Sequence, residues 1–393
     1  MKTNVAVIFG CRSVEHEVSI ISAVQAMRSA DTEKYDLYPV YVAKNGDMYT
    51  GKSLFEIEEF SDIDALLKKC EPITLVRQNG RVVIKFLNST LFKKKEDIEL
   101  SVAFPIVHGT NCEDGTLAGM LEFLGLPYVG CDTLSAAIGM NKAVFKDVLS
   151  AAGLPVLKCV TFSSREYSAN AAAVIENIKS QLKFPLIVKP VNLGSSVGIS
   201  KATDEASLTE AIELAVSFAD VVLVERAVEN LREINCSVLG NFDTAEASVL
   251  EEPIMHDEIL SYKDKYMGNS KSKGMASLGR KIPAEISEEK SAEIRELSVK
   301  IFKVLGCNGV VRIDFLMDSV TGEVFANEIN TIPGSLAFYL WDATGVNYTA
   351  LIDKLIELAF QRARARDNLT FTINTNILSG ISFGGAKGSK GGN

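Results

Sequence analysis

GVVRIDFLMDSVTGEVFANEIN, residues 309–330, predicts two β-strands joined by a turn, because two apolar runs flank a short polar segment. Arg312 and Asp314 are two positions apart in the first strand, so their side chains share one face. Glu328 and Asn330 have the same spacing in the second strand, and the turn places Glu328 roughly opposite Asp314. Two carboxylates and an amide in an apolar hairpin form an all-oxygen set suited to Mg²⁺. The alternative is a pair of cross-strand surface contacts with Arg312 as partner, and the apolar setting favours the metal.

Length and composition limit the class of protein. A chain of 393 residues exceeds one compact core and predicts two or three domains. Its longest apolar runs have strand length, and its N-terminus resembles no signal peptide, so we expect a cytoplasmic protein without membrane spans. Seven cysteines without a CxxC pair argue against a disulfide framework or a zinc site. A net charge of -9 argues against nucleic acid as a partner.

Short apolar runs alternate with amphipathic stretches along most of the chain, which predicts an α/β fold. Residues 51–98 are more charged and carry a hairpin signal at Asn79-Gly80. We expect strands at 4–10, 35–43, 101–107, 157–162, 185–190, 221–226 and 233–240. We expect helices from residue 15 onward, at 134–153, 168–182, 204–218 and 346–366.

Two central segments carry polar groups at strand ends. In FPLIVKPVNLGSSVGISK (184–201), an apolar strand delivers Lys189 before a Gly/Ser loop, which suits anion binding. A plain hairpin turn with a surface lysine explains this stretch equally well. VLVERAV (222–228) ends a strand in Glu225, and Glu233 follows. These carboxylates could accept hydrogen bonds from an adenine amine or from ribose hydroxyls. Such residues are more often solvated charges in hairpins.

Two polar loops follow buried strands in the first third of the chain. They are GCRSVEHEVS (10–19) and HGTNCEDG (108–115), and each leads into a helix. In open α/β sheets, ligands bind at this edge. Neither loop has the GxGxxG dinucleotide pattern, and Glu15 and His16 could instead be charges of a first helical turn.

Taken in order, the motifs EHEVS, HGxxxEDG, VKPxxxGSSVG, RxDF and NEINTIPG resemble the D-alanine–D-alanine ligase family of the ATP-grasp superfamily. The resemblance covers residues 4–366 and implies a three-domain ATP-grasp fold. Its parts would be a Rossmann-like substrate domain (1–137), a central ATP-grasp domain (138–228), a C-terminal ATP-grasp domain (229–366) and a flexible tail (367–393). The polar, Lys- and Gly-rich segment 256–281 would be a lid.

The resemblance also implies ligands for nucleotide and metal. For ATP, it points to Lys142 and Lys189 at the phosphates, Ser196 in the covering loop, Glu225 at adenine, Glu233 at ribose and Lys265 from the lid. Glu229 competes with Glu233, because the family's spacing is one residue shorter. Asp314, Glu328 and Asn330 match the residues that hold two Mg²⁺, for which Mn²⁺ could substitute.

For the amino-acid substrates, the resemblance implies that Glu15 holds the ammonium of the first D-amino acid, with His108 nearby. Arg312 would stabilise the acyl phosphate and the oxyanion, and Ser195 with Tyr266 would link the two subsites. The second carboxylate would meet Gly334, Ser335 and Leu336. In the family, four more residues separate NTIPG from this Ser-Leu pair, so the second subsite is altered here.

Three further positions depart from the family pattern: Cys112 in place of glycine, Ala118 in place of glutamine and Asn141 in place of aspartate. The implied enzyme is an ATP-dependent D-alanine–D-alanine ligase of peptidoglycan precursor synthesis that forms a D-alanyl phosphate and acts as a homodimer. One alternative is a ligase of this lineage with another second substrate, such as D-serine or another amine. The other is a nucleotide-binding homologue that no longer ligates. Tyr266 favours an amine as the second substrate.

Overall fold

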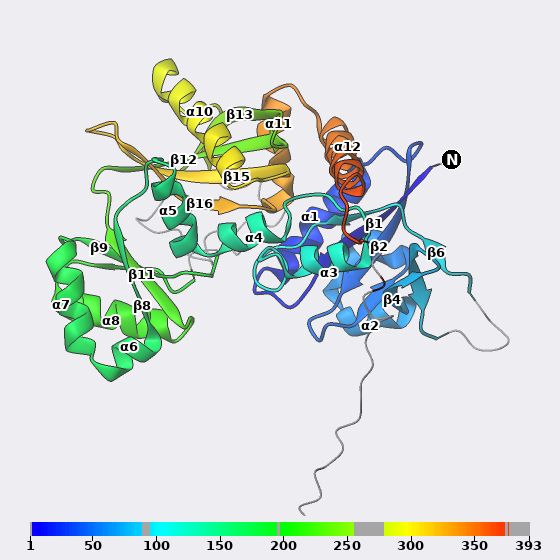
Figure 1. Cartoon of the computed structure of the whole chain (residues 1–393), viewed down its shortest axis with the longest axis horizontal. Coiled ribbons are helices and arrows are strands. Elements are labelled where there is room, and N and C mark those ends of the chain that lie inside the picture. The colour runs from blue at the N-terminus through cyan, green and yellow to red at the C-terminus, as the bar shows by residue number, and fades with distance from the viewer. Residues whose placement is uncertain (1, 89–94, 195–196, 255–278, 374–375, 377–393) are drawn as a thin grey trace, which may run out of the picture.

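The structure is a computed structural model that describes residues 2–88, 95–194, 197–254, 279–373 and 376. Three β-sheets organise these residues into a mixed α/β fold, as predicted (Figure 1). Their strand orders are β6-β5-β4-β3-β2-β1-β7, β10-β9-β11-β8 and β14-β13-β12-β15-β16. The exact domain boundaries stay a prediction.

The first sheet combines a parallel part with an antiparallel extension. Its parallel strands are β1 (Thr3–Gly10), β2 (Tyr35–Val42) and β7 (Val102–Pro105), and α1 (His16–Ser29) follows β1. The antiparallel strands are β3 (Met48–Thr50), β4 (Glu71–Gln78), β5 (Arg81–Phe86) and β6 (Ile98–Glu99). Short helices η1 (Lys52–Phe55), η2 (Ile57–Ser61) and α2 (Ile63–Lys69) connect β3 to β4. The predicted hairpin is confirmed, since Asn79 and Gly80 both have positive φ, as a tight turn between β4 and β5 requires.

The second sheet is antiparallel and carries helices whose apolar side chains form its core. Its strands are β8 (Cys159–Ser163), β9 (Leu186–Pro190), β10 (Ser200–Ala202) and β11 (Val221–Arg226). The helices are α6 (Ser164–Ala169), α7 (Ala171–Gln181) and α8 (Glu205–Val216). Ile178, Leu208 and Ile212 from α7 and α8 are fully buried in this cluster, which leaves the opposite face of the sheet for the site.

The third sheet contains the hairpin formed by residues 309–330. Its strands are β12 (Leu231–Gly240), β13 (Ala245–Pro253), β14 (Arg280–Lys281), β15 (Gly309–Asp318) and β16 (Val324–Asn330). Asp314 pairs with Glu328 and Arg312 with Asn330, so the predicted register is confirmed. A bulge at Asn327 interrupts the ladder directly before Glu328. The helix α10 (Glu288–Val304) covers β12 and β13, and neither α10 nor β13 was predicted.

One predicted helix is divided in the structure. The prediction of one helix over 134–153 is wrong, because α4 (Thr133–Met140) ends and α5 (Lys142–Ala151) begins at Asn141. Asn141 Oδ1 accepts from the N–H groups of Ala143 and Val144, which caps the new helix. An amide performs this capping as an aspartate would. The helix predicted near 168–182 is confirmed as α7, which begins slightly later because Asn170 caps it.

The last helix ties the third sheet to the first. The first region also contains α3 (Thr116–Leu124). After β16, the chain continues through η4 (Gly334–Ala337), α11 (Phe338–Ala343) and α12 (Tyr348–Asp367). Figure 1 places α12 beside α1, and Leu351 and Leu355 of α12 are fully buried in one core with Phe104 of β7. This packing brings the loops after β1 and β7 against the end of β16.

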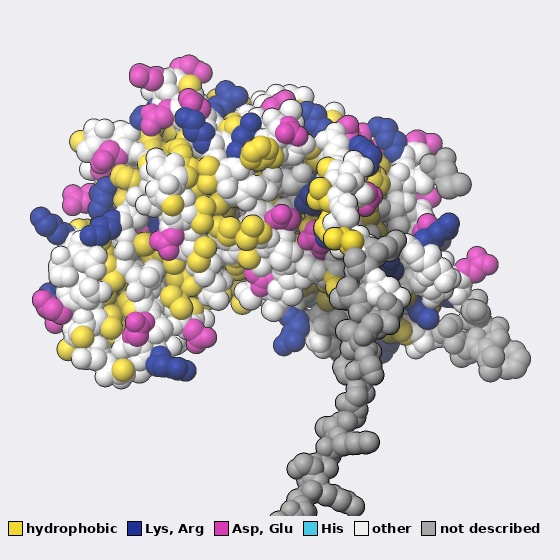
Figure 2. Space-filling view, in the orientation of Figure 1, with side chains coloured by type: hydrophobic (Ala, Val, Ile, Leu, Met, Phe, Trp, Pro, Cys, Tyr) yellow, Lys and Arg dark blue, Asp and Glu magenta, His cyan; other side chains and the backbone are white. Residues whose placement is uncertain are grey.

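The surface of the described residues mixes acidic and basic side chains on the face seen in Figure 2. Among the helices that the structure describes, none combines the length and apolar character needed to cross a membrane.

Candidate active site

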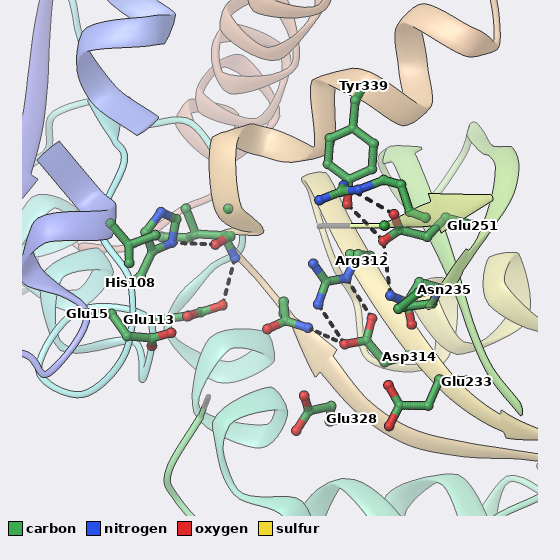
Figure 3. Close-up of a pocket in the computed structure, with 17 residues that line it drawn as sticks. Glu15, His108, Glu113, Glu233, Asn235, Glu251, Arg312, Asp314, Glu328 and Tyr339 are labelled. Atoms are coloured by element: carbon green, nitrogen blue, oxygen red, sulfur yellow. Dashed lines mark hydrogen bonds and ion pairs between the residues drawn. The ribbon is translucent and has the colours of Figure 1, made fainter. Parts of the chain in front are cut away.

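Two neighbouring cavities lie where the three sheets meet. The first cavity, of about 120 Å³, lies between the loops of the first sheet and the third sheet (Figure 3). The second cavity, of about 250 Å³, lies between the second and third sheets. Glu233, Asp314 and Glu328 line both cavities, so the hairpin β15–β16 and strand β12 form their common wall.

The hairpin holds Arg312 and Asp314 in a bidentate ion pair. Arg312 Nε donates to Asp314 Oδ1 at 2.6 Å and Nη2 to Oδ2 at 2.7 Å. Burial acts to lower the pKa of Arg312, but the charge and hydrogen bonds of Asp314, together with Tyr339 and Glu251, outweigh burial and hold that pKa above its ordinary value. Asn330 Nδ2 donates to Asp314 Oδ2 at 3.1 Å. The guanidinium is therefore fixed in place and permanently charged.

Glu328, on the same hairpin, faces a lysine from α5. Lys142 Nζ lies 3.1 Å from Glu328 Oε2 and donates to the carbonyl of Leu193 at 2.7 Å. The backbone N–H of Lys142 donates to the Val191 carbonyl, which anchors the start of α5 to the strand end after β9. With Asp314 and Asn330, Glu328 completes a set of carboxylate and amide oxygens at one hairpin end. Such a donor set fits a hard divalent cation.

A buried ion network forms the floor of the second cavity. Glu225 Oε1 lies 2.6 Å from Lys189 Nζ, and Glu225 Oε2 lies 2.8 Å from Lys146 Nζ. All three side chains are at least 96% buried. Burial acts to raise the pKa of Glu225, but the two lysines outweigh burial and hold it below its ordinary value. Lys189 Nζ also donates to Asn327 Oδ1 at 2.9 Å, so the bulge in β16 connects this network to the hairpin.

A chain of hydrogen bonds fixes His108 on the opposite side of the first cavity. His108 Nδ1 lies 2.8 Å from the Ile332 carbonyl, which can only accept, so Nδ1 carries the proton. Nε2 then accepts from the Ser22 hydroxyl at 3.0 Å, and Ser22 Oγ accepts from the Ser335 N–H at 2.9 Å. Burial lowers the pKa of His108, which keeps the imidazole neutral.

Glu113 is a buried carboxylate beside Glu15. It accepts from the N–H groups of Gly109 at 3.1 Å and Ile332 at 2.9 Å. Burial, followed by the charge of Glu15, raises the pKa of Glu113 to about 8. Gly109 has φ +77°, and a Cβ there would lie 2.9 Å from Glu15 Oε2. The glycine therefore allows two carboxylates to approach this loop.

The segment after Gly334 makes one left-handed turn. Ser335, Leu336 and Ala337 have φ of 49°, 56° and 50°, a conformation that non-glycine residues adopt reluctantly. Gly334 lines the first cavity, whereas Ser335 and Leu336 are buried away from it. Ser335 Oγ donates to Gln25 Oε1 at 2.7 Å. Their assignment to the second substrate stays a prediction.

The structure brings most of the predicted site residues together. Glu15, His108, Glu233, Arg312, Asp314, Glu328, Asn330 and Gly334 line the first cavity. Lys189, Glu225, Glu229, Glu233, Asp314 and Glu328 line the second. Lys142, Glu15, Glu328 and Asn330 line a smaller one between them. Ser195, Ser196, Lys265 and Tyr266, with most of segment 256–281, lie outside the described residues.

Several residues of the site were not predicted. They are Glu113, Lys146, Asn235, Glu251, Arg280, Asn327 and Tyr339. Signals existed for three of them. Glu113 and Asn327 belong to the quoted motifs HGTNCEDG and NEINTIPG, and Lys146 follows Lys142 by four residues, on the same helical face. Arg280 falls in the predicted lid segment 256–281, but no spacing marked it, or Asn235, Glu251 and Tyr339, as a site residue.

A fold in which two sheets flank a lysine-lined cavity, with acidic and amide oxygens on its edge, is that of the ATP-grasp ligases, which use ATP to form C–N bonds. The family model described as D-ala D-ala ligase C-terminus matches residues 148–357, and the model described as D-ala D-ala ligase N-terminus matches residues 4–131. The chain belongs to the D-alanine–D-alanine ligase family.

Individual relatives agree with this assignment over nearly the whole chain. The D-alanine–D-alanine ligase of Thermosipho melanesiensis is 38% identical over 378 residues, covering 95% of this chain and 98% of the relative. That of Caldicellulosiruptor bescii is 40% identical, covering 94% and 99%. The solved D-alanine–D-alanine ligase of Coxiella burnetii is similar with a TM-score of 0.79 at 31% identity, covering 93% and 96%. The VanG D-Ala:D-Ser ligase of Enterococcus faecalis has a TM-score of 0.77 at 33% identity, covering 91% and 100%.

Proposed function

We propose that this enzyme joins two molecules of D-alanine through a D-alanyl phosphate, for the synthesis of peptidoglycan precursors. The observation that carries this proposal is that Asp314 and Glu328 line both cavities, beside Arg312 in the first. One cavity has a floor of buried lysines suited to ATP, and the other faces Glu15 and His108. A group transferred from nucleotide to amino acid would cross this wall.

The chain's own residues support each step of the reaction. Glu15 would hold the ammonium of the first D-alanine, whose carboxylate attacks the γ-phosphorus of ATP and releases ADP. Lys142 and Lys189 would neutralise the phosphates, while Glu225 and Glu233, or Glu229, would contact adenine and ribose. Contacts to ATP would also come from Ser196 and Lys265. A link between the two amino-acid subsites would come from Ser195 and Tyr266. Mg²⁺, when bound, supplies further charge neutralisation, and Asp314, Glu328 and Asn330 offer oxygens for two ions, or for Mn²⁺ instead.

Peptide bond formation would use the fixed charge of Arg312. The amine of the second amino acid attacks the acyl carbon, a negative charge develops on the acyl oxygen, and inorganic phosphate leaves. A preorganised donor such as Arg312 stabilises that oxyanion because the donor needs no reorientation as the charge forms. The bidentate Asp314 contact supplies this preorganisation.

D-serine is a second candidate acceptor. The similarity to the solved D-Ala:D-Ser ligase and the shortened segment after Gly334 both favour its inclusion. The test is phosphate release from ATP with D-alanine and a panel of amine acceptors, with products identified by mass. We expect Mg²⁺-dependent phosphate release and the D-alanyl-D-alanine mass. Phosphate release at the background level with D-alanine would overturn the proposal. A dipeptide formed with D-serine as the acceptor, but not with D-alanine, would show that the second candidate is correct.

We further propose a cytoplasmic homodimer with a three-domain division after residues 137 and 228 and a lid within 256–281. Its partners would be small molecules only. Light scattering during gel filtration tests the dimer, and a monomer mass across the working concentration range would overturn it.

A further inference from the structure

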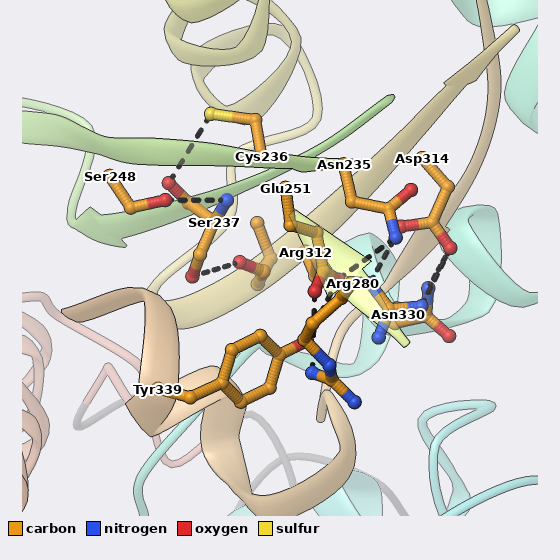
Figure 4. A network of polar contacts seen from close by, with 11 residues as sticks. Asn235, Cys236, Ser237, Ser248, Glu251, Arg280, Arg312, Asp314, Asn330 and Tyr339 are labelled. Carbon is orange, nitrogen blue, oxygen red and sulfur yellow. Dashed lines mark hydrogen bonds and ion pairs between the residues drawn. The ribbon is translucent and has the colours of Figure 1, made fainter. Parts of the chain in front are cut away.

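A polar network occupies one wall of the first cavity, on the third sheet and α11. Its members are Asn235 of β12, Glu251 of β13, Arg280 of β14 and Tyr339 of α11 (Figure 4). All four line the cavity, together with Arg312 and Gly334. The network therefore borders the space beside the oxyanion donor.

Glu251 is the centre of this network. Its Oε1 accepts from the Tyr339 hydroxyl at 2.8 Å and from Asn235 Nδ2 at 3.0 Å. Its Oε2 lies 3.3 Å from Arg280 Nη1. Burial raises the pKa of Tyr339, so the hydroxyl remains protonated and donates. Three donors from three elements hold one carboxylate that is 3% exposed.

Arg280 is held by this network in a defined orientation. Its guanidinium carbon lies 4.2 Å from the centre of the Tyr339 ring, a cation–π arrangement, while Glu251 holds one edge. A planar guanidinium fixed on one face and one edge keeps the geometry for bidentate recognition of a carboxylate.

The charges around the first cavity indicate what Arg280 can bind. Among the described residues that line it, the two side chains with a permanent positive charge are Arg280 and Arg312. Two of the three guanidinium nitrogens of Arg312, Nε and Nη2, are engaged in the bidentate pair with Asp314. His108 is neutral, and the remaining ionisable lining groups are carboxylates and the Tyr339 phenol. An incoming carboxylate would therefore be stabilised at Arg280, whereas the ionised carboxylates of the lining would repel it.

The family motif assigns the second carboxylate to Ser335 and Leu336, but the backbone N–H groups of both residues already donate to other groups of the protein. The Ser335 N–H donates to Ser22 Oγ at 2.9 Å, and the Leu336 N–H donates to the Pro333 carbonyl at 2.8 Å. Both residues are at least 97% buried. The left-handed turn thus removes the pair from the cavity and presents Tyr339, which follows four residues later, to it.

We propose that Arg280 binds the α-carboxylate of the second amino acid, and that Glu251 and Tyr339 are positioning residues that fix its guanidinium. This inference rests on the proposed function and names the group that recognises its acceptor. Tyr339, Arg280 and Arg312 line the same cavity, and Tyr339 contacts Arg280 directly. With its carboxylate at Arg280, the acceptor would lie in the same cavity as Arg312, beside which the acyl carbon must lie.

The test is a competition between two acceptors in one reaction. D-Alaninamide has the amine and methyl group of D-alanine but carries no carboxylate. With ATP, Mg²⁺ and equal concentrations of D-alanine and D-alaninamide, mass spectrometry measures the ratio of dipeptide to dipeptide amide. We expect Arg280→Gln to lower this ratio by about 100-fold, because a desolvated charge pair loses one partner. Arg280→Lys should restore part of it.

Hydroxylamine separates the two halves of the reaction. It traps an acyl phosphate as the hydroxamate and needs no carboxylate receptor, so Arg280→Gln should form D-alanyl hydroxamate at the wild-type rate. Arg232→Gln is the matched control, because Arg232 makes a bidentate ion pair with the neighbouring Glu252, and Arg232 does not line the first cavity. It should leave the product ratio unchanged.

Three outcomes would overturn the inference. An unchanged product ratio in Arg280→Gln would show that another group receives the carboxylate. An equal fall of both products and of the hydroxamate, or a matching ratio change in Arg232→Gln, would show a structural role only. Absence of hydroxamate with the wild-type enzyme would overturn the proposed function itself, and the acceptor role with it.

Discussion

The hairpin β15–β16 and the turn after Gly334 are consecutive in the chain and border the same cavity, yet they differ in how their side chains are directed. In the hairpin, Arg312, Asp314, Glu328 and Asn330 alternate with buried apolar residues and all face the site. In the turn, Ser335 and Leu336 point into the core, and Tyr339 of the following helix faces the site instead.

The difference shows which functional residues the chain's periodicity can locate. A strand alternates faces at every residue, so spacing alone determines which side chains share a face. Three consecutive residues with positive φ reverse the direction of side chains without any periodic signal. Each left-handed non-glycine residue costs on the order of 1–2 kcal/mol, so the surrounding contacts must maintain the turn.

The largest expected effect comes from a substitution in the hairpin β15–β16. Glu328→Gln should reduce D-alanine-dependent ADP formation on the order of 10²–10³-fold, because it removes a charge that faces Lys142 and the proposed metal position. The thermal midpoint and circular dichroism should remain close to wild type. Steady-state kinetics at saturating ATP provide the measurement.

A matched control lies in the turn of the same hairpin. Glu323 is exposed and lies 3.8 Å from Arg226, outside both cavities, so Glu323→Gln should leave turnover unchanged. Near-normal activity of Glu328→Gln would contradict the metal assignment. An equal loss in both variants would point to damage of the hairpin as a whole.

The next effect concerns the buried network beneath the hairpin. Lys146→Met should lower the free energy of unfolding by about 3 kcal/mol, because Glu225 keeps only one of its two buried cationic partners. Urea denaturation measures the change. The control Lys179→Met removes an exposed lysine that pairs with Glu205 and should change stability by less than about 1 kcal/mol.

A double variant sharpens this prediction. Lys146→Met with Glu225→Gln should recover part of the lost stability, since the remaining carboxylate charge is removed together with its partner. If the double variant is as unstable as the sum of both single variants, the two side chains act independently. Such a result would contradict a coupled network.

Sequence patterns predicted the parts of the fold and site that have a regular period, and they missed the parts that have none. The α/β fold, the register of Asp314 against Glu328 and the loops that carry Glu15 and His108 follow from period-two and helical patterns. Asn141 divides a predicted helix because a capping amide looks like any polar residue in a helical pattern. Glu251 and Arg280 could not be predicted, since only the pairing of β13 with β12 and β14 brings them to the wall.

Glu113, whose carboxylate accepts from the Ile332 N–H, should make the free energy of unfolding depend on pH. Its pKa is raised from 4.5 to about 8, so between these values the folded protein binds a proton that the unfolded chain has released. The free energy of unfolding should therefore fall as pH rises through this window. Glu113→Gln should remove that contribution and flatten the slope.

Urea denaturation of both proteins at several pH values between 5 and 8 measures the difference in slope. His108 contributes with the opposite sign, because its pKa is lowered, but it is common to both proteins and cancels in the comparison. An identical slope in the two proteins would mean that Glu113 is already ionised in the folded state.

The smallest expected effect lies at the turn itself. Ser335→Ala removes the hydroxyl that donates to Gln25 Oε1, a single hydrogen bond worth about 1 kcal/mol of stability. Because this hydroxyl points away from the cavity, the apparent KM for the second D-alanine should change by less than about threefold, well under the tenfold change that 1.4 kcal/mol would give. A tenfold or larger rise in that KM, together with an unchanged product ratio in Arg280→Gln, would show that the turn binds the acceptor's carboxylate. The hairpin and the turn would then both direct polar side chains into the site, and the contrast between them would hold only for Leu336.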